Sequence, residues 1–301
     1  MPAFRARYFL VLAAIATFTG DAKSAPPERP VLLAQQSPAP NRTAPPPDAS
    51  WPNAANTGVP AGTTLTVVEG NLKIETPGTI IDGKDIRGCV QVLAAGVIIR
   101  HSKIHCTFAY AVLSGGFTGE RFLIEDSEIE CSAPDGKGTP GTTAVGDNTF
   151  TARRLNIHHC ENGFDVDLDV TIQDNWIHDL TDDPQAHTDG IQFAVGRNVL
   201  VEHNAIYVIG TSAIITHPTS MDGVVIRNNL MAGGAYTLYC PRQHSANVHV
   251  IGNRFSRALY PRGGAYGVWT DCHKVAELRD NVWDDTGQPL AGQPIPRPPR
   301  D

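Results

Sequence analysis

A short pattern recurs through the middle of the chain and restricts the possible folds more than any other feature. Each copy reads, in order: apolar, any residue, apolar, polar, a turn residue (commonly Asp, Asn or His), Asn or Ser, any residue, apolar. Val97–Ile104 and Phe122–Ile129 are clear examples, and a weaker copy spans Thr79–Ile86. Further copies end in Arg154–Ile157, Asp174–Ile177, His203–Ile206, Asn228–Met231, Gly252–Phe255 and Asp280–Trp283.

Successive copies lie 20 to 29 residues apart. A period of this size, with apolar and polar residues alternating inside each copy, indicates a solenoid of stacked strands. Helical repeats would instead place apolar residues three and four positions apart, and the ladder of leucines typical of leucine-rich repeats is missing. We therefore predict an all-β fold, a parallel β-solenoid of about nine or more coils.

The Asn position of the repeat has a specific role in such a stack. Coils about 4.8 Å apart place equivalent residues above one another. Side-chain amides at this position can then bond to one another and satisfy backbone groups at the corner of each coil. We expect an internal ladder of Asn175, Asn204, Asn229, Asn253 and Asn281.

The chain divides into four segments. Residues 1–24 resemble a secretory signal, because Arg5 and Arg7 precede an apolar stretch too short to span a bilayer. Residues 25–50 are rich in proline and suit an extended linker. Residues 51–285 form the repeat domain, and residues 286–301 are a second proline-rich tail. We predict a secreted or periplasmic monomer without a membrane span.

Charge and motifs exclude several functions. The net charge is −7 and no basic run is dense enough to bind nucleic acid. The chain also lacks Cys-x-x-Cys, His-Glu-x-x-His, Walker-type and Gly-x-Ser-x-Gly sequences, which argues against redox, zinc-protease, nucleotide and serine-esterase chemistry.

Six cysteines in an exported chain favour disulfides. Cys106 and Cys131 occupy equivalent positions and could form a bond between coils. The competing scheme pairs Cys89 with Cys106 and Cys131 with Cys160. Cys240 and Cys272 are expected to pair in either scheme.

A second strand in each coil carries the most informative polar residues. Aligning these strands predicts one outward column of Asp165, Gln192, Ile215, Tyr239 and Trp269. A second column, two residues further on, contains Asp167, Ala194, His217, Pro241 and Asp271. Carboxylates, His and aromatic rings on one face, with Arg242 just beyond, predict a binding groove along the side of the solenoid.

Three segments of this face resemble the pectate-lyase-like superfamily of right-handed parallel β-helices. Pro241–Asn253 is similar to the Pro-Arg … Val-His-Val … Asn-Asn stretch of pectate lyases, with Tyr239 where those enzymes have a catalytic Arg. Gly163–Asn175 resembles the stretch that supplies their calcium-binding carboxylates, which implies a Ca²⁺ site at Asp165 and Asp167.

The third segment, His187–Gln192, is similar to the Asn-Thr-Asp-Gly-Ile-Asp signature of polygalacturonases, although Ser212 to Ile214 replace the paired Asp of the next coil. These resemblances imply a right-handed β-helix that binds a polysaccharide. Tyr239 and Trp269 could stack on sugar rings or cap the core of the last coils. We expect Gln192, Trp269 and Asp271 to contact the polymer.

The loop from Asp179 to Asp189 is rich in carboxylates, which suits the oxygen ligands of Ca²⁺. Thr188-Asp189-Gly190 should hold His187 and Asp189 at the mouth of the groove. Stacking should place Asp189, His217 and Arg242 across two coil spacings, roughly 10 Å.

We predict β-elimination on an acidic, uronate-containing polysaccharide. In that reaction a cation neutralises the uronate carboxylate and a base removes the adjacent proton. Arg242 and His217 could fill these roles, with Tyr239 as acid. Alternatives are hydrolysis by Asp189 with Asp165 or Asp167, and a rod that binds polysaccharide without cleaving it.

A column on the other strand of each coil contains His105, Glu130, His158, His178 and Tyr207. Stacked imidazoles beside a Glu could bind a transition metal, but such sites have a close pair of ligands plus a third, and the column does not show this spacing. We interpret it as a polar ladder.

Overall fold

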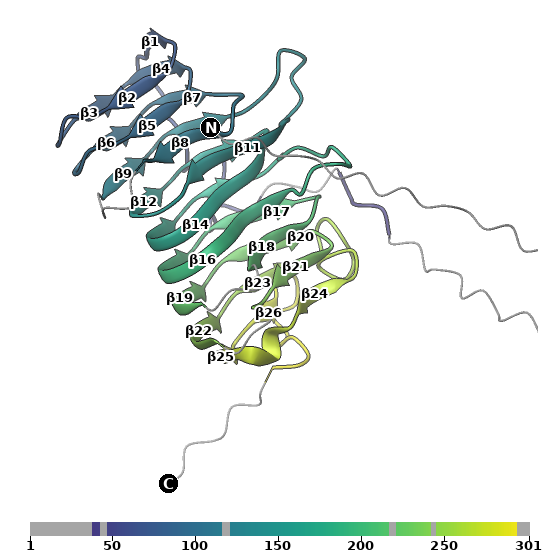
Figure 1. The fold of residues 1–301 in the computed structure, drawn as a ribbon. Helices are drawn as coiled ribbons and strands as arrows, with labels where there is room; N and C mark the ends of the chain where they lie inside the picture. Colours follow the sequence, from purple (N-terminus) through teal and green to yellow (C-terminus); the bar gives the residue numbers. More distant parts are fainter. Residues whose placement is uncertain (1–37, 43–46, 116–120, 217–220, 242–244, 294–301) are drawn as a thin grey trace, which may run out of the picture. The chain divides into compact units, whose positions relative to one another are not determined.

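The computed structural model describes residues 38–42, 47–115, 121–216, 221–241 and 245–293, all within the compact unit Ser37–Asp301. The described part consists of short parallel strands stacked as successive coils, as Figure 1 shows. Its one helical element is the 3₁₀ turn η1 (Cys272–Lys274). The predicted signal segment and most of the predicted linker lie outside the described residues.

The first of two sheets, which we call sheet A, contains the strands that end each copy of the repeat. Every neighbouring pair in it is parallel, and each strand belongs to a different coil. In spatial order its ten strands are β1 (Thr66–Glu69), β4 (Lys84–Arg87), β7 (Lys103–His105), β10 (Glu128–Glu130), β13 (Asn156–His158), β15 (Trp176–Ile177), β17 (Ala205–Val208), β20 (Leu230–Gly233), β23 (Arg254–Ser256) and β26 (Val282–Trp283).

The second sheet, sheet B, has two arms that are joined where β14 (Cys160–Gln173) and β16 (Asp189–Glu202) run through both. The first arm otherwise contains β2 (Leu72–Ile74), β5 (Val90–Val92), β8 (Tyr110–Ser114), β11 (Thr139–Gly146), β18 (Ser212–Thr216), β21 (Tyr236–Tyr239) and β24 (Gly267–Thr270). The second arm contains β3 (Ile80–Asp82), β6 (Ile98–Arg100), β9 (Phe122–Glu125), β12 (Phe150–Arg153), β19 (Asp222–Arg227), β22 (Ser245–Ile251) and β25 (Val275–Arg279).

The core lies between the two sheets and is built from aligned apolar columns. One column of the first arm aligns Val112, Val145, Phe164, Ile191 and Ile214, all fully buried. Alternation along each strand turns the next residue outward, so a shift of one position would exchange core and surface. The apolar pattern therefore fixes which polar side chains reach the surface.

The corner before each sheet A strand explains the repeat. Its turn residue has a left-handed backbone with φ between 46° and 64° in the eight main copies, a conformation that Asn, Asp and His tolerate better than most residues. The following residue is a buried Asn in five of these coils. Asn recurs at this position of the repeat because its side chain bonds to the same position in the neighbouring coil.

The predicted asparagine ladder is confirmed. The Nδ2 group of Asn204 donates to Oδ1 of Asn229 at 2.9 Å and to the Ile172 carbonyl at 3.0 Å. Its own Oδ1 accepts bonds from the backbone N–H and the Nδ2 group of Asn175, each at 2.9 Å. The same contacts repeat through Asn253 and Asn281. Each buried amide thus satisfies backbone groups of two coils.

Asn204→Ala should lower the free energy of unfolding by about 2–4 kcal/mol, because it strands several buried donors and acceptors. The exposed Asn247 bonds to Asp222 at 2.6 Å, so Asn247→Ala is the matched control and should cost at most about 0.5 kcal/mol. Urea unfolding followed by circular dichroism measures both. Equal midpoints for the two variants would contradict a stabilising ladder.

Three disulfides link neighbouring coils: Cys89–Cys106, Cys131–Cys160 and Cys240–Cys272. The expected Cys106–Cys131 bond is wrong, and the competing scheme is confirmed. Cys106 and Cys131 lie two residues after the last apolar residue of their repeats, whereas Cys89 and Cys160 lie three residues after it. The extra residue, Gly88 or His159, places each of these cysteines within bonding distance of its partner. Disulfides of this number indicate folding in an oxidising compartment.

The ends of the described part also pack on the coils. Trp51 is 7% exposed and stacks on His203 with ring centroids 5.1 Å apart. The sequence placed the end of the repeat domain at 285, whereas contacts continue beyond it: Leu290 is buried and Gln293 bonds to Asn281. No helix among the described residues is long and apolar enough to cross a membrane.

Candidate functional site

The candidate site lies on the outward side of the first arm of sheet B, around β14 and β16. Strand register places Asp165 beside Gln192, Gln192 beside Ile215, and Ile215 beside Tyr239. This part of the predicted outward column is confirmed. Asp165, Gln192 and Tyr239 are each partly exposed.

The predicted column is wrong for its last residue, Trp269. Trp269 pairs with the inward residue Leu238, and Thr270 takes the position beside Tyr239. The Trp269 ring packs edge to face on Phe255 with centroids 5.5 Å apart and contributes to the core. The sequence alignment matched the first apolar residue of each strand, which here is Val268. In the structure it is the next residue, Trp269, that is in register with the core residue Leu238. Trp269 thus caps the last coils.

Asp189 is buried beneath His187 rather than exposed at the mouth of a groove. Its side chain is 0% exposed, and Oδ2 bonds to Nδ1 of His187 at 2.7 Å. The Ser212 hydroxyl donates to the other carboxylate oxygen. Burial corrects the expectation that Asp189 could act directly on a sugar, and it makes this carboxylate a support for the His187 ring.

His187 itself is 56% exposed and held from both sides of its loop. Its backbone N–H donates to Oε1 of Glu161 at 3.2 Å, while the Asp189 N–H donates to Oδ1 of Asn162 at 2.9 Å. The hydrogen bond to Asp189 raises the pKa of His187. Since Asp189 accepts the Nδ1 proton, the arrangement presents Nε2 of His187 as the reactive nitrogen.

We expect nuclear magnetic resonance titration to give His187 a pKa above the ordinary value of about 6.5. Asp189→Asn should lower this pKa, because it removes the buried negative charge that favours the imidazolium. The other histidines serve as internal controls and should keep their values. An unchanged His187 pKa in the variant would show that Asp189 does not control the ring.

A second group of charges lies along β14. The Tyr110 hydroxyl donates to Oδ2 of Asp165 at 2.9 Å. Oδ1 of Asp165 is buried and has no hydrogen-bond partner within the described structure. Burial, followed by the charge of Asp165, raises the pKa of Asp147. Asp167 also has a raised pKa, caused by burial and then by the charges of Asp147 and Asp165.

The contact between Tyr110 and this cluster of carboxylates depends on a glycine. Gly146 of β11 lies beside the Tyr110 strand, and a Cβ there would come within 2.5 Å of the Tyr110 ring. The missing side chain lets Tyr110 reach across one coil to Asp165. Burial and the charges of Asp165 and Asp147 in turn raise the pKa of Tyr110, so its hydroxyl stays protonated at neutral pH.

The donors present fit a hard cation. Burial, followed by the neighbouring carboxylate charges, raises the pKa of Asp147 and Asp167. Within the described structure one buried oxygen of Asp165 has no donor. Oxygen-binding cations such as Ca²⁺ neutralise such an environment. The predicted metal residues Asp165 and Asp167 thus come together, and the structure adds Asp147. Extending the outward column one strand upstream reaches Gly146, which follows the Val145–Phe164 pair, so the column alone would have missed Asp147 by one residue.

The remaining predicted site residues do not gather in one place in the described structure. Burial, mainly, and the charge of Asp189 raise the pKa of Tyr239, which lies two strands from Gln192 in the outward column. Asp271 instead faces Lys274, with Oδ1 3.3 Å from Nζ, at the start of η1. His217 and Arg242 lie outside the described residues, so their predicted roles stay predictions.

A pocket of about 230 Å³ continues the same side of the chain towards the first coils. Tyr110 lines it together with Lys73, Gln91 and Phe108. The Phe108 side chain is exposed. Tyr110 therefore contacts both the carboxylate group and this pocket, which suits an extended ligand.

A family model described as a right handed beta helix region matches residues 75–283. The chain therefore belongs to this family, which confirms the predicted right-handed parallel β-helix. The solved structures similar to this chain include two from Azotobacter vinelandii. The mannuronan C-5 epimerase AlgE4 A-module is 12% identical, with 69% of this chain and 71% of that chain covered and a TM-score of 0.30. The AlgE6 A-module is 13% identical, with 75% and 73% covered and a TM-score of 0.27. No curated protein matches the chain.

Proposed function

We propose that the protein is a polysaccharide lyase that cleaves an acidic, uronate-containing polymer by β-elimination. The observation that carries the proposal is an exposed imidazole, His187, fixed by a wholly buried carboxylate, Asp189. A general base needs such a partner to hold the ring in one tautomer. The long face of the β-helix supplies the space for a polymer.

His187 is the base in this proposal. Nε2 takes the proton from the carbon beside the uronate carboxylate, and the electron pair of that C–H bond forms a C=C bond. The bond from the neighbouring ring carbon to the glycosidic oxygen then breaks. The oxygen takes a proton from the Tyr239 hydroxyl, whose raised pKa keeps it protonated until then.

The carboxylates on β14 would repel a polyanion unless a cation covers them. Asp147, Asp165 and Asp167 would hold Ca²⁺, as the orphan oxygen of Asp165 supports. When bound, Ca²⁺ supplies positive charge that neutralises a uronate carboxylate and acidifies the neighbouring proton. The residues themselves would contribute three carboxylates, two from β14 and one from Asp147, which follows β11.

Hydrolysis fits the geometry less well. A glycosidase needs two carboxyl groups facing the scissile bond. Asp189 is fully buried and both of its oxygens accept hydrogen bonds, from Ser212 and His187. It cannot protonate a glycosidic oxygen from there, so pairing it with Asp165 or Asp167 gives no acid at the bond.

Activity is tested on a panel of uronate polymers by following ultraviolet absorbance of unsaturated ends. We expect release by the wild type and a loss of about 10²–10⁴-fold in kcat/KM for His187→Gln. The rate should rise with pH through the pKa of His187, because only the neutral ring accepts a proton. Asp189→Asn should move this rise to lower pH.

Other products would decide against the proposal. Reducing ends without absorbance would identify a hydrolase, and inverted uronate residues in an uncleaved chain would identify an epimerase. Co-sedimentation with a polymer that stays unchanged would identify a binding rod. His101→Asn is a control for loss of one histidine on another surface, and it should keep full activity.

Calcium binding is tested by thermal unfolding with Ca²⁺ or a chelator. Ca²⁺ should raise the Tm of the wild type, and Asp165→Asn should remove most of that rise. Protons compete for Asp147 and Asp167, whose pKa values are raised, so the effect should weaken as pH falls. Asp169→Asn on the same strand is the matched control, because the Asp169 carboxylate accepts a hydrogen bond from the exposed Asn198. The same rise in Asp165→Asn would place the cation elsewhere.

A further inference from the structure

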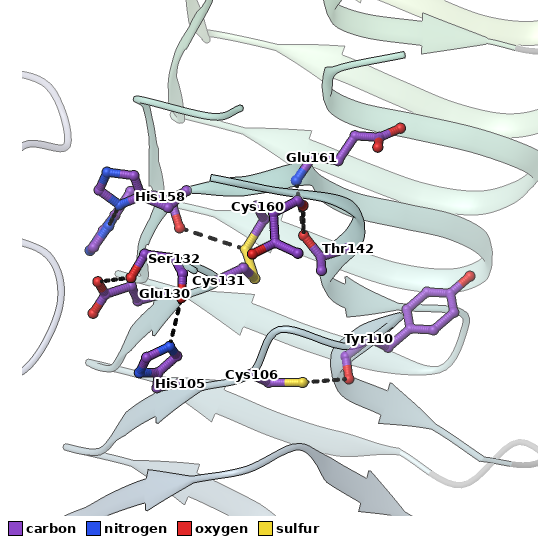
Figure 2. Close-up of a disulfide and its surroundings, with 12 residues drawn as sticks. His105, Cys106, Tyr110, Glu130, Cys131, Ser132, Thr142, His158, Cys160 and Glu161 are labelled. Carbon is purple, nitrogen blue, oxygen red and sulfur yellow. Dashed lines mark hydrogen bonds between the residues drawn. A yellow bond between two sulfur atoms is a disulfide. The ribbon is translucent and has the colours of Figure 1, made fainter. Parts of the chain in front are cut away.

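A cluster of imidazoles and carboxylates on sheet A has no part in the proposed reaction. One ligand atom from each of Glu130, His158 and His159 lies within 4.8 Å of the others. Nδ1 of His158 and Nδ1 of His159 are 2.6 Å apart. Figure 2 shows Glu130 and His158 on one side of the Cys131–Cys160 disulfide and Glu161 and Tyr110 on the other. The cluster is therefore separate from the candidate active site.

The polar-ladder interpretation missed this cluster because it compared only equivalent residues of successive coils. His159 follows His158 directly and would normally point to the opposite face of a strand. Its backbone is left-handed, with φ 61°, and this turns the side chain back beside its neighbour. The two rings meet edge to face with centroids 4.8 Å apart. The close pair of ligands plus a third is thus present.

Surrounding contacts prepare His158 for a cation. Its Nε2 lies 3.2 Å from Oε1 of Glu128, so the carboxylate accepts the Nε2 proton and Nδ1 keeps its lone pair. Metal-binding histidines are usually oriented by such a carboxylate. His178, the next imidazole of the ladder, is occupied by Asp179 at 2.7 Å and Asn156 at 2.8 Å. These contacts therefore orient the His158 ring, while His178 is held by other partners.

The disulfide fixes the distance between these ligands. Glu130 precedes Cys131 on one coil, and His158 and His159 precede Cys160 on the next, with the two cysteine Cα atoms 4.7 Å apart. Side chains that bind a metal must be held close before it arrives. Here the covalent link adjoins Glu130 and His159 directly and lies two residues from His158.

We propose that Glu130, His158 and His159 bind a divalent transition cation of the Zn²⁺ class. Two imidazoles and one carboxylate suit Zn²⁺ in a four-coordinate site that leaves one position for water. Nitrogens bound to one Zn²⁺ lie about 3.3 Å apart, since each Zn–N distance is about 2.0–2.1 Å. A small rotation of one ring would open the present 2.6 Å separation to that value.

Two neighbours compete with the cation for Glu130. Lys103 Nζ lies 2.8 Å from Oε2, and the Ser132 hydroxyl donates to Oε1 at 2.5 Å. Lys103 also pairs with Glu128 at 2.9 Å, and its side chain is 33% exposed. It can therefore keep Glu128 as a partner while Glu130 turns towards a metal.

The test measures Zn²⁺ bound to tag-free, chelator-stripped full-length protein by equilibrium dialysis and elemental analysis. We expect one Zn²⁺ per chain, with affinity more than about tenfold lower in His158→Gln and in His159→Asn, since even loss of an orienting group costs that much. Asn accepts the left-handed backbone at 159, so this variant should fold. Co²⁺ added instead should show the visible absorption of a four-coordinate site.

The matched control is His101→Asn. His101 also has a left-handed backbone, φ 48°, and pairs with Asp82 at 2.9 Å. Its replacement should leave Zn²⁺ affinity unchanged. The proposal is overturned if stripped wild-type protein binds no Zn²⁺, or if His158→Gln and His159→Asn bind it as tightly as the control. In that case the two rings share a proton.

Discussion

The structure depends on buried backbone groups at one corner of every coil finding partners in the next coil. A left-handed turn residue aims the chain inward, and the amide that follows bonds to the coils on either side. Coils that slipped by one residue would leave these groups unsatisfied in a dry interior. The asparagine ladder thus sets the register of the five coils that carry it, which include β14 and β16 of the candidate site.

The candidate site combines a rigid and a responsive part. His187 rests on a carboxylate that solvent cannot reach, so its orientation is fixed before any ligand arrives. Asp147 and Asp167 have raised pKa values, caused first by burial and then by the neighbouring carboxylate charges, including that of Asp165. A cation would relieve that repulsion, which couples ligand binding on this face to the ions present.

The fold could be predicted because one short repeat, with the same alternation of apolar and polar residues in each copy, determines it. The outward column held from Asp165 to Tyr239 and failed at Trp269, where the last strand carries an extra apolar residue. The prediction that Asp189 lies at the mouth of the groove was wrong, because the Ser212 hydroxyl that holds its carboxylate in the interior comes from the next coil. His159 was missed for a different reason: a single left-handed residue reverses a side chain, and strand alternation does not anticipate this.

Gln293 closes the stack. Its Oε1 accepts bonds from the N–H and the Nδ2 group of Asn281, in the way that each asparagine serves the coil before it. A final coil without this residue would present unmet donors to any other molecule with a similar corner. Solenoids need such terminal caps to avoid growing end to end into filaments. By accepting two bonds from Asn281, Gln293 removes donors to which a second molecule could bind.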